Sequence, residues 1–167
     1  MFPAANKASF VLIIILSIIL LNSSACTNDG ESQFGIYLVE TGELVISEHH
    51  IERYHWDTHT IKLNEEGIKK WNSYMTYKSI PKLAESLFKK NFSIKVKGKE
   101  IYRGQFYSGA SSASYSGVVI MDSLFKLDEE LNTISINFGY PQHQPGSADD
   151  PRNNNEIFNV LKEAELL

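Results

Sequence analysis

A single cysteine constrains how this chain of 167 residues can be stabilised. Cys26 has no second thiol as a partner, so no disulfide can form within the chain. Stability must therefore come from a packed apolar core. The length that follows Cys26 is sufficient for one domain of ordinary size.

Residues 1–25 have the features of a signal peptide. One cation, Lys7, precedes an apolar run from Phe10 to Leu21, and small residues follow up to Ala25. The run, about 12 residues, is shorter than the roughly 20 residues that a membrane-spanning helix needs. We therefore expect residues 1–25 to be cleaved as a leader and not kept as an anchor.

Cys26 follows Ser23-Ser24-Ala25, and two cleavage chemistries compete at this bond. Ser23 and Ala25 satisfy an ordinary A-x-A-like site, whereas a lipoprotein signal normally has an aliphatic residue where Ser23 stands. We favour lipidation, because a lone cysteine at the first mature position has a chemical purpose once its thiol is acylated. Acyl chains on Cys26 would hold the protein stably on membrane lipid.

Lipidation at Cys26 predicts the location of the mature protein. Residues 26–33 would be a polar tether to the membrane. We expect the protein to lie in the cell envelope, anchored to a membrane outside the cytoplasm. The alternative is a soluble secreted or periplasmic protein.

The charge pattern argues against a nucleic-acid-binding protein. The formal net charge is −4, and basic residues are interleaved with acidic ones along the chain. The nearest approach to a basic patch consists of Lys89, Lys90, Lys95, Lys97 and Lys99. Alternate lysines line one face of a strand, and we interpret them as a solvated face that discourages edge pairing, with an anion site as the alternative.

Apolar periodicity over residues 34–167 predicts a single α+β domain. Strands are expected at residues 34–40, 58–63, 92–96, 100–107, 117–121 and 131–138. Helices are expected at residues 64–78, 80–88 and 157–164, with a short helical turn at 47–54, a loop at 108–116 and a surface excursion at 140–155. Turns join most of the strands and the helices fall into clusters, so we expect a mixed or largely antiparallel sheet with helices packed on one face.

Residues 58–108 carry a pattern of strand, two helices and hairpin. It consists of the strand Thr60-Ile61-Lys62-Leu63, the helix start Asn64-Glu65-Glu66-Gly67-Ile68-Lys69-Lys70-Trp71, Leu83-Ala84 in a second helix, and a hairpin around Ile94-Lys95-Val96 and Ile101. This pattern resembles the periplasmic head subdomain of the protein-export membrane protein SecD. The resemblance implies a non-catalytic module that contacts exported polypeptide. It transfers no functional residue, because the matched positions are a helix cap, a helix turn and apolar core positions.

Four histidines within one short stretch are the first candidates for chemistry. They are His49, His50, His55 and His59, and His55 and His59 have the i, i+4 spacing used in helical zinc sites. However, His59 falls where an alternating strand is expected to begin, and Asp57 is a poor third ligand in the same short segment. We therefore expect exposed or hydrogen-bonded histidines and assign no metal ligand.

Three other groups of residues are candidates for a site. The serine-rich loop at Gly109-Ala110-Ser111-Ser112 lacks the G-x-S-x-G pattern of a nucleophile elbow, so we interpret it as a flexible loop. Glu65 and Glu66 are neighbours on a helix, so their carboxylates diverge and serve as first-turn charges. The aromatic residues Tyr102, Phe106, Tyr107 and Tyr115 either contact a peptide or glycan or, more commonly, pack within the sheet.

These observations favour a lipid-anchored module that binds a protein or peptide at the membrane surface. We expect no enzymatic activity, no cofactor and no catalytic residue, and lipidation at Cys26 as the one modified site. The alternative is a metal-dependent or hydrolytic envelope enzyme that uses the His49–His59 region with Asp57. A third hypothesis is a purely structural lipoprotein.

Overall fold

The computed structural model describes residues 32–75, 87–109, 111–122, 126–141 and 149–167. The expected signal peptide, the expected lipidation site Cys26 and the tether up to residue 31 lie outside these ranges. Most of the second expected helix also lies outside them, except Leu87 and Phe88. Residues 31–167 form one compact unit.

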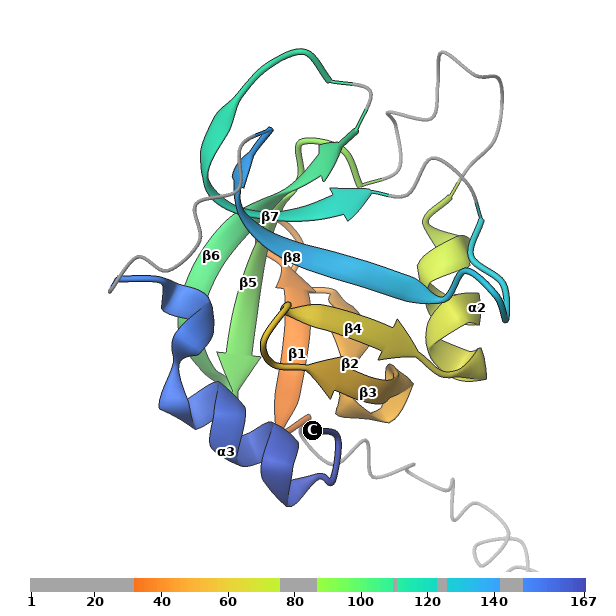
Figure 1. The fold of residues 1–167 in the computed structure, drawn as a ribbon, viewed down its shortest axis with the longest axis vertical. Coiled ribbons are helices and arrows are strands. Elements are labelled where there is room, and N and C mark those ends of the chain that lie inside the picture. The colour runs from red at the N-terminus through yellow and green to blue at the C-terminus, as the bar shows by residue number, and fades with distance from the viewer. Residues whose placement is uncertain (1–31, 76–86, 110, 123–125, 142–148) are drawn as a thin grey trace, which may run out of the picture. The chain divides into compact units, whose positions relative to one another are not determined.

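The described strands form one mixed sheet that curls around the core (Figure 1). In chain order the strands are β1 (Phe34–Leu38), β2 (Leu44–Ser47), β3 (Ile51–His55), β4 (Thr60–Leu63), β5 (Asn91–Val96), β6 (Lys99–Ser108), β7 (Tyr115–Asp122) and β8 (Thr133–Tyr140). Their order in the sheet is β2-β1-β5-β6-β7-β8-β4-β3. All neighbouring strands are antiparallel except β6 and β7, which run parallel.

Two helices are described, and each begins after an asparagine that caps its first turn. The side chain of Asn64 accepts a hydrogen bond from the Gly67 amide at the start of α2 (Glu65–Ser73), and Asn154 caps α3 (Asn155–Glu163) in the same way. Helix α2 packs against β2, β4 and the short 3-10 turn η1 (Glu48–His50), whereas α3 packs against β1, β5 and the turn η3 (Pro151–Asn153). The sheet and helices agree with an α+β architecture, and packing of the helices on one face stays a prediction.

One apolar cluster fills the inside of the curled sheet. Alternation along β5 directs Phe92, Ile94 and Val96 into it, and α2 adds the fully buried Trp71. The opposite face of the sheet is also covered near one end, because Tyr107 of β6 and Val119 of β7 are buried outside this cluster. Apolar packing therefore continues onto the outer face beside β6 and β7.

The structure corrects two expectations about segments between the predicted elements. The helical turn expected at 47–54 is limited to η1, since residues 51–55 pair with β4 as the strand β3. The excursion expected at 140–155 does not stay on the surface, because Asp150 and Arg152 at its end are buried. Both differences arise from contacts between segments distant in the sequence, which the local apolar periodicity does not encode.

The position of β5 in the sheet contradicts our interpretation of its lysines. We interpreted Lys95 and its neighbours as charges that discourage edge pairing, but β5 lies between β1 and β6. An interior strand has no free edge to protect. These lysines therefore need another explanation.

Candidate functional site

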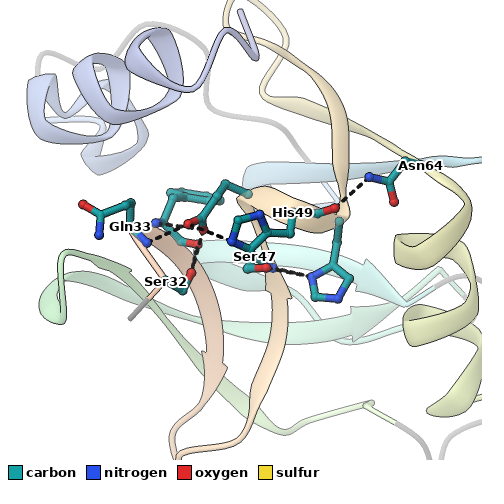
Figure 2. A network of polar contacts seen from close by, with 8 residues as sticks. Ser32, Gln33, Ser47, His49 and Asn64 are labelled. Carbon is teal, nitrogen blue, oxygen red and sulfur yellow. Dashed lines mark hydrogen bonds and ion pairs between the residues drawn. The ribbon is translucent and has the colours of Figure 1, made fainter. Parts of the chain in front are cut away.

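Glu48 in η1 accepts hydrogen bonds from the residues at which the described chain begins, among them Ser32 and Gln33, which Figure 2 labels. Its carboxylate accepts hydrogen bonds from the Ser32 hydroxyl at 2.6 Å and from the backbone amides of Gln33 at 2.8 Å and Phe34 at 3.1 Å. Burial alone would raise the pKa of Glu48, but these hydrogen bonds lower it below its ordinary value. Ser32 and Gln33, which we expected to belong to the tether, are thus attached to the fold.

His50 links the edge strand β2 to helix α2. Its Nδ1 atom lies 3.0 Å from the backbone nitrogen of Ser47 and 2.9 Å from the Ser47 hydroxyl. The backbone carbonyl of His50 accepts a hydrogen bond from the backbone N–H of Asn64 at 3.1 Å. A Cβ atom built on Gly67 would lie only 2.2 Å from that carbonyl oxygen. Gly67 therefore allows α2 to start directly against η1.

The other candidate histidines do not gather around one point. His49 and His55 are exposed, whereas His59 is buried and its Nδ1 lies 3.0 Å from the Tyr54 hydroxyl. Asp57 is exposed in the turn between β3 and β4. Among the described residues, no three His, Cys, Asp or Glu side chains are grouped so that they could hold a metal ion.

A buried polar network lies beside His59, and the local sequence pattern carries little signal of it. Arg152 of η3 donates to Asp150 from Nε at 2.9 Å and to the Ile136 carbonyl from Nη1 at 2.8 Å. The Ile136 amide in turn donates to the His59 carbonyl at 2.9 Å. Tyr54 joins the network through its contact with His59.

Charges in this network alter the acidity of its members. Burial would raise the pKa of Asp150, but the hydrogen bonds and charge of Arg152, with a smaller effect of His59, lower it. Burial raises the pKa of Tyr54 and of Tyr102 well above the ordinary value for tyrosine. Both phenols therefore stay neutral near pH 7, and that of Tyr54 hydrogen-bonds His59.

The serine-rich loop is held by tyrosine hydroxyls. Tyr107 donates to the Ala113 carbonyl at 2.9 Å, and Tyr140 donates to the carbonyls of Gly109 at 3.2 Å and Ser111 at 3.1 Å. These bonds fasten the connection between the parallel strands β6 and β7, which is shorter than the dozen or more residues usual for such strands. The loop residues thus have a structural role that the flexible-loop interpretation missed.

Aromatic rings gather beside this loop. The Tyr107 ring centroid lies 4.9 Å from that of Tyr140, 6.1 Å from that of Tyr115 and 5.8 Å from that of Phe88. Tyr107 is buried, whereas the other three rings are half-buried. We call these four residues the aromatic end.

The candidate aromatic residues therefore separate into two groups. Tyr102 and Phe106 belong to the main core, and only Tyr107 and Tyr115 belong to the aromatic end. Tyr140 and Phe88 were not among our candidates, because strand pairing and a turn bring them there from distant positions. Glu65 and Glu66 are exposed on the first turn of α2, and Glu65 bonds Lys69 at 2.6 Å.

Comparisons of the chain with protein-family models, with curated proteins and with solved structures find no match. The resemblance to the SecD head therefore stays a prediction. None of the described helices has the length and apolar character needed to cross a membrane.

Proposed function

We propose that this chain is a lipid-anchored, non-catalytic module that binds a protein or peptide at the cell envelope. The observation that carries the proposal is the separation along β6 between the start of the described chain, at Ser32 and Gln33, and the aromatic end. Strand β6 begins at Lys99, opposite Val96, and Val96 is paired with Phe34 next to the tether. The same strand reaches Tyr107 of the aromatic end eight residues later, which is about 26 Å at the usual rise of a strand.

Acylation of Cys26 would orient the domain relative to the membrane. The six residue-to-residue steps from Cys26 to Ser32 span at most about 22 Å when fully extended. The Glu48 hydrogen bonds fix where that tether joins the fold. The tether end would then face the membrane, and the aromatic end would face away from it, where a polypeptide partner can reach it.

The chemistry of the aromatic end suits a polypeptide partner. Half-buried tyrosine and phenylalanine rings offer apolar area without a large loss of side-chain entropy. Of the candidate nucleophiles and bases, Ser111 is hydrogen-bonded within the loop and His59 within the core, whereas His49 and His55 are exposed and do not gather around one point. This arrangement supports binding over hydrolysis.

Site-specific photocrosslinking in intact envelopes tests the proposal. A photoreactive phenylalanine replaces Tyr115 at the aromatic end, and the matched control replaces His49, which is exposed beside the tether. We expect a protein adduct from position 115 and none of the same mass from position 49. Equal adducts at both positions, or none at 115, would count against the proposal.

Two further measurements address the anchor and the alternative enzyme. Mass spectrometry of the processed N-terminus should find acyl chains on Cys26, and an unmodified thiol would remove the anchoring claim. Zinc titration by calorimetry should give no heat, whereas micromolar uptake that is lost in His55→Ala would favour a metal-dependent protein.

A further inference from the structure

Lys95 on β5, Lys97 in the turn that follows and Lys99 at the start of β6 have different surroundings. Lys97 and Lys99 lie 3.7 Å and 2.7 Å from the carboxylates of Glu163 and Glu156 on α3. Lys95 instead lies over the ring of Tyr37, 4.8 Å from its centroid. Among the described residues, no carboxylate lies within ion-pair distance of Lys95.

The backbone of β1 explains how the Tyr37 ring comes to lie under Lys95. Gly35 and Lys95 are directly paired, and a Cβ atom on Gly35 would lie 2.6 Å from the Tyr37 ring. The absence of that Cβ lets the ring lie across the strand toward Lys95. The lysine ammonium then rests on the aromatic face, a favourable contact for a cation.

Strand pairing places further polar side chains on the same face of the sheet. Ser93 is paired with Tyr37 on one side and with Arg103 on the other, and Asn91 is paired with Gln105. These residues face away from Phe92 and Ile94 in the core. We call the outer strip the set Tyr37, Asn91, Lys95, Arg103 and Gln105; Ser93 lies among them but is itself buried.

A second stacked cation lies where the outer strip meets the aromatic end. Lys89 lies over Phe88 at 5.4 Å, and the Lys89 carbonyl accepts from Gln105 at 3.4 Å. Lys89 is exposed, and no described carboxylate lies within ion-pair distance of it. Lys89 and Lys95 are six residues apart, at most about 20 Å along an extended chain.

The acidic side chains near the outer strip already form hydrogen bonds with other residues. Glu100 accepts from Arg103 at 2.8 Å, and Glu40 accepts from the backbone and side chain of Asn91 at 3.0 Å and 2.9 Å. Lys90 lies near Glu40 and lowers its pKa after the larger effect of the Asn91 hydrogen bonds. Among the described residues, Lys89 and Lys95 therefore have no carboxylate within ion-pair distance, and Glu100, which is paired opposite Lys95 on β6, is bonded to Arg103 instead.

We propose that the outer strip binds an extended acidic segment of a polypeptide, with one carboxylate at Lys89 and another at Lys95. Between the two cations lie the amides of Asn91 and Gln105, which bond Glu40, the Lys89 carbonyl and each other, and a peptide backbone would add to or replace these bonds. A nucleic acid or other phosphate polymer would need cations along the whole strip, because its charges are closely spaced. This inference rests on the proposed function and names the chemistry of its partner.

Peptide binding to the full-length protein in detergent tests the inference. The probe is a fluorescent peptide with two glutamates separated by five serines, and the controls are a peptide with adjacent glutamates and one with lysines in place of the glutamates. We expect the spaced acidic peptide to bind best by anisotropy at 50 mM salt. Binding should weaken strongly at 500 mM salt, because exposed charges are then screened.

Charge-neutral variants locate the binding surface. Lys89→Gln and Lys95→Gln should each weaken binding by about 2–5-fold, as expected for exposed ion pairs. Lys69→Gln is the matched control, since Lys69 is exposed on α2 and already paired with Glu65. Melting curves should show that all three variants stay folded.

Two results would overturn the inference. One is equal peptide affinity in the wild type and the Lys89→Gln, Lys95→Gln double variant, and the other is tighter binding of inorganic polyphosphate than of the spaced peptide. If either occurs while Tyr115 still crosslinks to a protein, the acidic-peptide assignment fails and the proposed function stands.

Discussion

Arg152 and Asp150 form an ion pair that is almost completely removed from solvent. Their side chains are 3% and 2% exposed, and Arg152 also donates to the Ile136 carbonyl on β8. The pair therefore attaches the segment before α3 to a central strand. A buried pair of this kind is costly to form, but it is more costly to break from one side.

Asp150→Asn should destabilise the fold strongly. The substitution leaves the Arg152 charge buried without a counter-charge, which typically costs about 3–5 kcal/mol. Urea unfolding followed by circular dichroism measures the loss. Glu65→Gln is the control, because it breaks a fully exposed pair with Lys69, and no measurable change is expected there. A loss in Asp150→Asn no larger than in this control would contradict the prediction.

Asp150 should also make the fold sensitive to acid. The Arg152 interactions outweigh burial and keep the pKa of Asp150 below its ordinary value in the folded state. The unfolded chain therefore binds the proton first, near pH 4, and stability falls as the pH drops toward the folded pKa. The unfolding free energy of Asp150→Asn should depend less on pH than that of the wild type between about pH 5 and pH 2. Parallel pH curves for the two proteins would refute this assignment.

His50 should affect stability at milder pH. Burial lowers the pKa of His50 in the folded state, and the nearby cation Lys70 adds to the effect, against opposing charges from Glu66 and Glu48. The unfolded chain accepts a proton near pH 6.5, so stability is complete above that value and declines as the pH falls toward the folded pKa. His50→Asn, which keeps an acceptor near Ser47, should remove this decline in denaturation curves between pH 7 and pH 5. Persistence of the full decline in the variant would assign it to another group.

Gly67→Ala should disrupt the contact between α2 and η1. The new Cβ atom would lie 2.2 Å from the His50 carbonyl oxygen, so the backbone must shift, and the expected cost is about 1–3 kcal/mol or more. Gly109→Ala is a suitable control, because the nearest atom to its Cβ is 3.9 Å away on a flexible methionine. Thermal melts of both variants test the difference. Equal melting temperatures would show that the helix start can adjust freely.

Glu48→Ala should release the beginning of β1. Three donors from Ser32, Gln33 and Phe34 lose their acceptor, and the partly buried amide of Phe34 loses a charge-assisted hydrogen bond. Hydrogen exchange by mass spectrometry should show faster exchange at residues 32–36 than in the wild type. Glu52→Ala, which breaks an exposed contact with Lys62, provides the control. Unchanged exchange in Glu48→Ala would mean that strand pairing alone holds this segment.

The sequence determined the elements whose structure depends on neighbouring residues. The hairpin of β5 and β6 with its turn at Lys97 and Gly98 follows from alternation and from two residues with positive φ angles. The starts of α2 and α3 follow from Asn64 and Asn154, whose side chains satisfy amides of the first turn. Such signals are local, so they can be recognised without knowledge of the fold.

The tertiary structure alone decided which residues meet across long separations. The sequence predicted a strand that carries Lys95 but did not reveal that this strand, β5, lies between two others. Lys95 therefore projects from the outer face of the sheet and does not protect an edge. It also gave no sign that Arg152 would be buried beside Asp150 and Ile136, in a segment rich in turn residues. Strand order and burial depend on how distant segments share one core. The local pattern of the chain records which side chains are apolar, but it does not record which of them become neighbours.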